Sequence, residues 1–316
     1  MSETTKSKDF RTSIGGQALM EGIMMRGPKK QSIVINTKDG FVTKTEDISL
    51  PKDKHPILGV VFIRGVVNFI NSLVIGMRAI TYSAEFAMDD DEEEELSGFD
   101  KWINEKLGNE KAEKVIIGIA VVIAVALMIG MFFILPTVLA GLFSRFFDHH
   151  MLRSLTEGVL RIIIFILYLW LATRLKDIKR MWAYHGAEHK AIYCYERGLE
   201  LTVENVEKQS KQHPRCGTSF LFIVMIVSVL VFSLTTWTNI WMRIGMRLIL
   251  LPVVVAISYE IIKLAGRYDN LLTRIISAPG KALQKLTTSE PDEAMIQTAI
   301  EAISEVIPEN EKEAQW

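Results

Sequence analysis

The chain has 316 residues, of which 49% are apolar, and its formal net charge is −1. The high apolar fraction argues against an ordinary soluble enzyme and favours a membrane protein, and the near-zero charge argues against a nucleic-acid partner. The two cysteines, Cys194 and Cys216, are too few for a disulfide framework and fit a reducing, cytosolic environment. The first eleven residues are polar and charged, so we expect no secretory signal peptide.

The N-terminal part opens with a glycine- and methionine-rich stretch over residues 14–28. Two short strands are predicted after it, at 32–36 and 41–45, because a Lys-Asp-Gly turn signal separates two strand-like runs. We expect a single β-hairpin, with the glycine-rich stretch as a loop packed on it. If that loop folds over a site, Glu21 is a further ligand or base candidate.

Residues 57–77 are strongly apolar except for a polar stripe at helical spacing. The stripe consists of Arg64, Asn68, Asn71 and Ser72. Such a helix can lie in the membrane interface, line a cavity or re-enter the membrane, and a full span is the alternative. The seven consecutive acids at 89–95 indicate a solvated linker, and they lack the turn glycine of a calcium loop.

Four long apolar segments predict membrane spans. They cover residues 115–144, 155–173, 217–242 and 244–262. Pro136 is expected to kink the first span, and Glu157 and Arg161 to form an i,i+4 pair near the start of the second.

The distribution of basic residues predicts the orientation of these spans. The stretches 101–114, 174–216 and 263–285 carry 18 Lys and Arg, whereas the loops 144–154 and 239–247 carry four. Both termini and the long central loop are therefore expected on the cytoplasmic side.

The most specific motif is His185-Gly186-Ala187-Glu188-His189. Two histidines four residues apart share one helix face and can reach one metal ion, and the order His-x-x-Glu-His matches that of inverzincin metallopeptidases. We expect His185 and His189 as metal ligands with either Glu260 or His213, and Glu188 as the general base. Cys216 is an alternative ligand. In a non-catalytic alternative, both histidines lie at the lipid headgroup boundary and bond phosphates or backbone.

Three blocks along the chain resemble the signature blocks of YqhQ-type proteins. They are residues 15–28, residues 185–190 (His-Gly-Ala-Glu-His-Lys) and residues 213–219 (His-Pro-Arg-Cys-Gly-Thr-Ser). The resemblance covers residues from about 12 to 285. It implies a multispanning membrane protein, in a family sometimes labelled a predicted metal-dependent enzyme. It implies no substrate and no established catalytic residues.

The sequence as a whole predicts a mainly α-helical, polytopic membrane protein with about four spans and a small cytoplasmic α+β portion. The predicted segments are a glycine- and methionine-rich part with the hairpin (1–55), the striped helix (56–88), an acidic linker and pre-membrane helix (89–114), two spans (115–175), a cytoplasmic loop (176–216), two further spans (217–265) and a cytoplasmic tail (266–316). We expect the tail after residue 289 to form an acidic amphipathic helix that faces solvent or a partner.

The predicted function is that of a metal-dependent enzyme, most simply a hydrolase, at the cytoplasmic face of the cell membrane. A divalent metal ion such as zinc is the expected cofactor, and a lipid-linked molecule or a membrane peptide the expected substrate. The alternative is a non-enzymatic helper for membrane-protein insertion or assembly. Its partners would be other membrane proteins or the translocon, besides the lipid bilayer.

Overall fold

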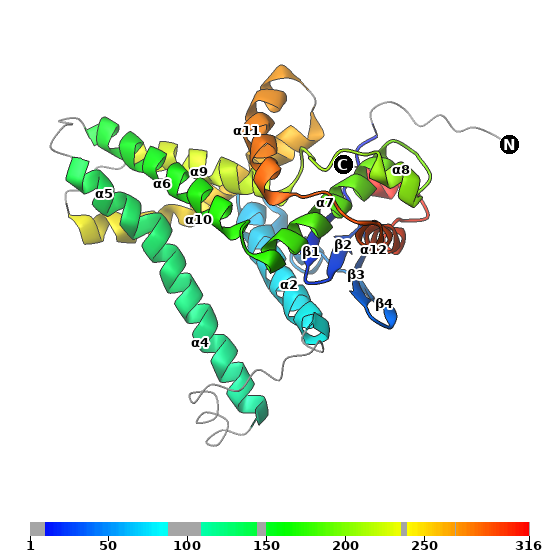
Figure 1. Ribbon diagram of the computed structural model, residues 1–316. Helices are drawn as coiled ribbons and strands as arrows, with labels where there is room; N and C mark the ends of the chain where they lie inside the picture. The colour runs from blue at the N-terminus through cyan, green and yellow to red at the C-terminus, as the bar shows by residue number, and fades with distance from the viewer. Residues whose placement is uncertain (1–9, 88–108, 144–149, 235–238, 269, 316) are drawn as a thin grey trace. The chain divides into compact units, whose positions relative to one another are not determined.

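A computed structural model of the protein describes residues 10–87, 109–143, 150–234, 239–268 and 270–315 (Figure 1). The chain divides into two units. Unit 1 comprises Met1–Asp89, Tyr168–Ser228 and Leu250–Trp316, and unit 2 comprises Asp90–Leu167 and Val229–Ile249. The acidic run at 89–95, predicted to be a linker, lies outside the described residues.

Unit 1 contains an antiparallel sheet whose strands follow the order of the chain. The strands are β1 (Gly15–Leu19), β2 (Gly22–Arg26), β3 (Lys30–Thr37) and β4 (Gly40–Asp47). The predicted hairpin corresponds to β3 and β4, with Thr37 paired to Gly40 across the turn. The prediction of a loop at the glycine-rich stretch is wrong, because that stretch forms β1 and β2. Residues 22–25 of β2 are all buried, so the strand lacks the alternation of polar and apolar residues by which a half-exposed strand is recognised.

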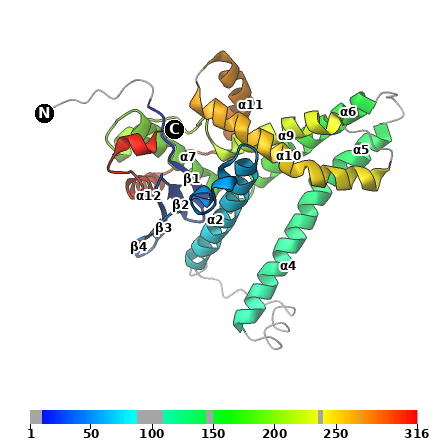
Figure 2. The same cartoon turned by 180° about the vertical axis from the view of Figure 1, so that it is seen from behind.

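The two faces of this sheet pack against different helices. One face contributes Ile23, Met25 and Val34 to a core shared with α7 (Lys176–Glu196) and α12 (Glu293–Ser304). The other face contributes Leu19, Met24, Ile33 and Ile35 to a core with α2 (Ile63–Ala87). Figures 1 and 2 show α2 running beside the strands.

The C-terminal tail completes this core. Helix α12 begins at Asp292, whose side chain accepts a hydrogen bond from the Met295 N–H, and it buries Met295, Ile296, Ala299 and Ile303. The amphipathic helix expected in the tail is therefore present, and its apolar face packs on α7 and the sheet of the same chain. Backbone pairing of Ser13 N–H with the Ala314 carbonyl, at 2.6 Å, holds the two ends of the described chain together.

Among the described residues, four helices are long and apolar enough to cross a membrane: Ile63–Phe86, Val115–Leu142, Ser154–Ala172 and Trp241–Arg267. These helices indicate a membrane protein. Three of them overlap predicted spans, and the first is the striped helix. The predicted span 217–242 corresponds only in part to a helix: α9 (Gly217–Ser233) has 17 residues, and residues 235–238 are not described.

Unit 2 contains α4 (Asn109–Ile129), α5 (Leu135–Phe143) and most of α6 (His150–Ala172). A π-helical turn, Gly130–Ile134, separates α4 from α5 immediately before Pro136. Proline has no N–H to donate to the Phe132 carbonyl, which instead accepts a hydrogen bond from Arg161 Nε at 2.9 Å. The irregularity of the helix near Pro136, predicted as a kink, is thus a π-helical turn.

The expected pair of Glu157 and Arg161 is confirmed at 3.3 Å, and Arg247 joins it. Arg247 lies in α10 (Ile240–Arg267), and its Nη2 atom is 2.8 Å from Glu157 Oε2. The Thr137 hydroxyl donates to Glu157 Oε1 at 2.7 Å and accepts from Arg247 Nη1 at 2.8 Å. We call Thr137, Glu157, Arg161 and Arg247 the Glu157 network.

Candidate metal centre

Helix α7 holds both motif histidines in the interior of unit 1. His185, Glu188 and His189 are at most 8% exposed, on a helix whose residues 183–192 are all buried. The backbone around residue 289 passes close to α7 at Gly186. A Cβ at position 186 would lie 2.2 Å from the Ser289 carbonyl oxygen, so this contact requires glycine. The Ser289 N–H in turn donates to the Trp182 carbonyl at 2.9 Å, so this crossing fixes the orientation of α7.

The structure brings both histidines together with Cys216. One potential ligand atom from each of His185, His189 and Cys216 lies within 4.8 Å of the others, and all three residues are buried. The His185 Nε2 atom is 3.1 Å from Cys216 Sγ. We call these three residues the His/Cys cluster. Their two nitrogens and one sulfur are the ligand types that zinc prefers.

The second ring nitrogen of each histidine is held by a backbone carbonyl. Nδ1 of His185 is 2.8 Å from the Thr287 oxygen, and Nδ1 of His189 is 2.6 Å from the Lys211 oxygen. Because a carbonyl only accepts, each Nδ1 carries the hydrogen, and Nε2 of the neutral ring keeps its lone pair. His189 Nε2 is buried and has no hydrogen-bond partner among the described residues. Metal-binding histidines are typically oriented in this way.

The electrostatics of the cluster favour a deprotonated sulfur. Burial alone would raise the pKa of the Cys216 thiol, but the neighbouring His185 and His189 rings bring that pKa well below its usual value. Burial lowers the pKa of His185, yet the Cys216 thiolate and Glu188 outweigh it and raise that pKa to about 9. A metal cation that binds here in place of the His185 proton would therefore bind a Cys216 sulfur that is already deprotonated.

Glu188 lies beside the cluster with one oxygen free. Its Oε1 atom accepts a hydrogen bond from the Gly16 N–H at 3.0 Å, whereas Oε2 is buried and has no partner among the described residues. Burial raises the pKa of Glu188, although the two histidines partly oppose this. A Cβ at Gly16 would lie 2.7 Å from the Met24 carbonyl oxygen and 3.0 Å from the Glu188 carboxyl carbon. Gly16 was not predicted as a site residue, although the Gly-Gly pair that begins β1 is a sequence signal for such a close approach of the backbone.

His213 is adjacent to the cluster but differently engaged. Its ring centroid is 5.7 Å from that of His189. Its Nε2 atom is 3.3 Å from Glu196 Oε2, and its Nδ1 accepts from the Arg215 N–H at 3.4 Å. Burial, together with Arg215, lowers the pKa of His213 to about 4, against the opposing effect of Glu196. Both ring nitrogens of this predicted ligand are therefore occupied.

The predicted ligand Glu260 and the candidate Glu21 each form an ion pair. Glu260 on α10 accepts hydrogen bonds from Arg64 on α2, with Nε to Oε1 at 2.8 Å. Glu21 pairs with Arg180, whose Nη2 lies 2.6 Å from Glu21 Oε2, and also accepts from the Tyr184 hydroxyl at 3.2 Å. The described residues that could jointly hold a metal ion do not include either glutamate.

A cavity of about 1010 Å³ opens onto the His/Cys cluster, and we call it the cluster cavity. Glu188, Gln17 and Trp182 line it together with the cluster. All four polar-stripe residues of α2 line it as well, which is one of the arrangements that the sequence allowed for that helix. Asn68 is fixed there by a 2.8 Å hydrogen bond to the Tyr259 hydroxyl.

Comparison with known proteins identifies the family of this chain. Residues 60–309 match the family model described as Protein of unknown function (DUF1385). The chain is 32% identical over 308 residues to a Bacillus subtilis (strain 168) protein described as Uncharacterized protein YqhQ, and the match covers 93% of this chain and 92% of the relative. No solved structure matches. The protein therefore belongs to the DUF1385 family, to which its YqhQ-like blocks pointed.

Proposed function

We propose that this protein is a metal-dependent hydrolase with its site at a membrane surface, and that His185, His189 and Cys216 hold a divalent metal ion such as zinc. One observation carries the proposal: His189 Nε2 is buried without a partner among the described residues, although its Nδ1 is fixed by a backbone carbonyl. An unpaired polar atom in the interior costs about 1–3 kcal/mol, so its retention beside a thiolate needs a reason. A bound cation supplies that reason.

The number of ligands supports catalysis over a purely structural role. Structural zinc sites have four protein ligands, whereas catalytic sites have three and keep one position open. The His/Cys cluster offers three, and it opens onto a cavity of about 1010 Å³. A metal ion bound here supplies Lewis-acid activation of water and of a substrate carbonyl or phosphoryl oxygen.

Glu188 is suited to accept the proton from the attacking water. Its Oε1 atom is anchored by Gly16, so Oε2 is held in place with its lone pairs free. Because burial raises the pKa of this carboxylate, it is a better base than an exposed glutamate. The polar groups of α2 on the opposite wall would orient the substrate, and we propose that this substrate is lipid-linked or a membrane peptide.

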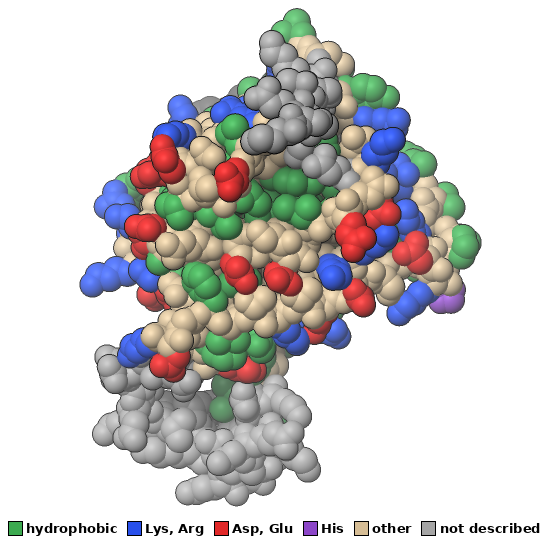
Figure 3. All heavy atoms as spheres, turned by 90° about the vertical axis from the view of Figure 1, so that its right-hand side faces the viewer, with side chains coloured by type: hydrophobic (Ala, Val, Ile, Leu, Met, Phe, Trp, Pro, Cys, Tyr) green, Lys and Arg blue, Asp and Glu red, His purple; other side chains and the backbone are tan. Residues whose placement is uncertain are grey.

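The packing of unit 1 supports a particular arrangement in the membrane. The sheet, α7 and α12 share one core, so all three lie on the same side of the bilayer. Acidic and basic side chains are interspersed over the face shown in Figure 3, as on a surface that meets water. We place this side in the cytoplasm, because the basic stretches predict it.

A chain that returns to one side must cross the membrane an even number of times. Three candidate spans, Ile63–Phe86, Val115–Leu142 and Ser154–Ala172, lie between β4 and α7. Ile63–Phe86 is the least apolar of the three, and its helix packs on the sheet. We therefore propose that the other two cross as a pair, that α9 and α10 cross as a second pair, and that α2 lies in the interface.

Metal content tests the proposed function directly. The protein is purified in mild detergent without metal-affinity resin, and bound metals are quantified by mass spectrometry. We expect about one divalent metal per chain, lost in His189→Ala and Cys216→Ser. The matched controls are His55→Ala, an exposed histidine, and Cys194→Ser, a buried cysteine outside the cluster; both should retain the metal. A metal-free wild type, with folded variants, would overturn the proposal.

Glu188→Gln separates an enzyme from an assembly factor. The amide keeps the acceptor oxygen for Gly16 but cannot take a proton, so fold and metal content should persist while hydrolysis is lost. An assembly factor would tolerate this change, so a Glu188→Gln variant that keeps its fold, its metal and its wild-type function would overturn the hydrolase proposal.

A further inference from the structure

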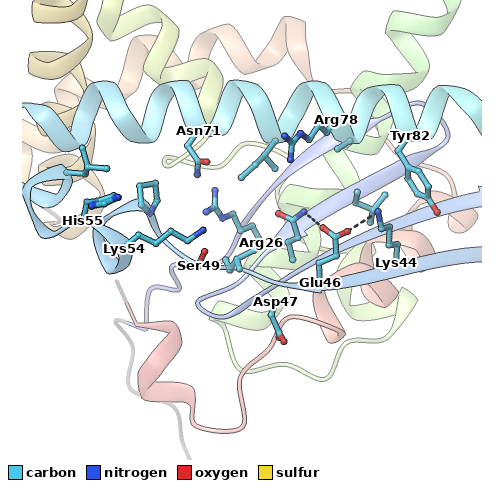
Figure 4. A pocket seen from close by; sticks show the side chains of 17 residues that line it. Arg26, Lys44, Glu46, Asp47, Ser49, Lys54, His55, Asn71, Arg78 and Tyr82 are labelled. Carbon is cyan, nitrogen blue, oxygen red and sulfur yellow. Dashed lines mark hydrogen bonds and ion pairs between the residues drawn. The ribbon is translucent and has the colours of Figure 1, made fainter. Parts of the chain in front are cut away.

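A second cavity, of about 600 Å³, lies between the sheet and α2 (Figure 4). It is lined by side chains from β2, β3, β4, α2 and the short helix α1 (Pro51–Lys54). Arg26, Lys54 and Arg78 are among them, and we call this cavity the Arg26 pocket. None of the three His/Cys cluster residues lines it, although Arg26 and Asn71 line both this pocket and the cluster cavity.

The Arg26 pocket carries uncompensated positive charge. Glu46, the acid inside it, is already occupied by Gln31 at 3.3 Å and by Lys44 at 2.9 Å. Asp47 points away from the pocket in Figure 4. Among the described residues, no ion pair joins Arg26, Lys54 or Arg78 to an acid.

Arg26 shows that this charge is not merely a solvated surface feature. Its guanidinium is partly buried, and burial lowers its pKa with no carboxylate to oppose the shift. Removing a cation from water without a partner is costly, so a half-buried arginine of this kind favours a bound anion. In Figure 4 Arg26 rises from the sheet towards α2, with Lys54 and Arg78 on either side of it and Asn71 above.

The outer face of α2 indicates where such an anion would come from. Ile70, Leu73, Val74 and Met77 form an exposed apolar stripe in which every residue is at least 44% exposed. Arg78 follows this stripe directly and lines the pocket. Apolar surface beside a cationic pocket is the arrangement that receives a lipid with an anionic headgroup.

We propose that the Arg26 pocket binds a phosphate group through Arg26, Lys54 and Arg78. The planar guanidinium groups match the oxygens of phosphate in a bidentate manner, and the Asn71 amide offers a further donor. The phosphate of an anionic lipid is the source that the apolar stripe favours, and free inorganic phosphate is the other source of the same chemistry.

Binding to three probes tests this site by calorimetry on the full chain in mild detergent. The probes are short-chain phosphatidylglycerol, a diacylglycerol with the same tails but no phosphate, and inorganic phosphate. We expect phosphatidylglycerol to bind and the diacylglycerol not to bind. If millimolar inorganic phosphate displaces phosphatidylglycerol, free phosphate is also a ligand of the pocket. If inorganic phosphate does not displace it, the lipid is the ligand. Either result supports a phosphate site.

Variants assign the binding to this pocket. Arg26→Gln and Arg78→Gln should each weaken phosphatidylglycerol binding about tenfold, and Arg26→Lys less, since a charge-assisted hydrogen bond is removed in the glutamine variants. Arg78 is exposed, so its variant should fold normally. Lys285→Gln is the matched control, because Lys285 is exposed and lines neither cavity.

Two outcomes would overturn the proposal. One is equal affinity for phosphatidylglycerol in the wild type and in both glutamine variants, and the other is equal affinity of the wild type for phosphatidylglycerol and the diacylglycerol. Arg78 lines this pocket and not the cluster cavity, so a loss of binding in Arg78→Gln, unlike one in Arg26→Gln, is assigned to this pocket and not to the His/Cys cluster.

Discussion

The His/Cys cluster of unit 1 and the Glu157 network of unit 2 both bury ionisable groups, but they satisfy them differently. In the Glu157 network, one carboxylate is shared by two arginines, and Arg161 also bonds the carbonyl freed by Pro136. The Arg247 guanidinium additionally lies 5.4 Å from the centre of the Phe232 ring. Both sites contain buried polar atoms without a partner among the described residues, but of different kinds. In the Glu157 network the atom is Arg247 Nε, a donor, whereas in the His/Cys cluster a nitrogen of His189 and an oxygen of Glu188 are acceptors beside a cavity.

This difference separates stability from function. Charges inside apolar helices are tolerated when they pair with one another, and such pairing holds the helices together. Acceptor atoms left open in a buried, pre-oriented set are instead available to a ligand. We therefore assign the Glu157 network a structural role and the His/Cys cluster a functional one, and four changes test this assignment.

The largest effect is expected from Glu157→Gln. It removes a carboxylate that pairs with both Arg161 and Arg247, and breaking a buried pair typically costs about 3–5 kcal/mol. Apparent melting temperature in detergent should fall sharply, with metal content per folded chain unchanged. Thr156→Ala, at a half-buried neighbour outside the Glu157 network, is the control. A variant as stable as wild type would contradict the structural role.

A smaller effect is expected from acidification, through His213. Its pKa of about 4 lies below the roughly 6.5 of an unfolded chain, so the unfolded state binds more protons between these values. The contribution of His213 to stability is therefore complete above about pH 6.5 and falls as the pH drops towards about 4, by about 3 kcal/mol. Thermal unfolding across this range measures the loss, and His213→Gln should flatten it. An unchanged pH profile in that variant would show that His213 is not the group responsible.

Gly16→Ala should cost about 1–3 kcal/mol, because the added methyl group would collide with the Met24 carbonyl and the Glu188 carboxylate. Gly15→Ala is a matched control, since a Cβ at Gly15 meets nothing within 4 Å. Unfolding in denaturant compares the two variants. If both behave alike, Gly16 does not fix Glu188.

The smallest effect is expected from Glu260→Gln. The Arg64–Glu260 pair is 26% and 19% exposed, so solvent screens it and its loss should cost at most about 1 kcal/mol. Metal content should stay at the wild-type level, because Glu260 is paired with Arg64 and lies outside the His/Cys cluster. Loss of the metal in this variant would restore Glu260 as a ligand and require a rearranged site.

Local patterns predicted much of the molecule. The i,i+4 spacing was sufficient to place His185 and His189 on one face, and Glu157 and Arg161 in contact. The stripe of polar residues on the 57–77 segment was sufficient to predict a helix with one polar face. The β1–β2 hairpin was missed because β2 is buried on both faces, which removes the alternation that reveals a strand.

The sequence by itself determined the apolar helices, the histidine pair and the family, because each depends on residues that are close along the chain or on blocks that match directly. Only the tertiary structure decided which third residue joins the histidines. Cys216 is 31 residues from His185 in the chain. His213 lies close to Cys216 in the chain, yet its side chain is paired with Glu196. Such choices depend on how helices pack and which polar atoms find partners, and contacts between distant segments are not encoded in local periodicity.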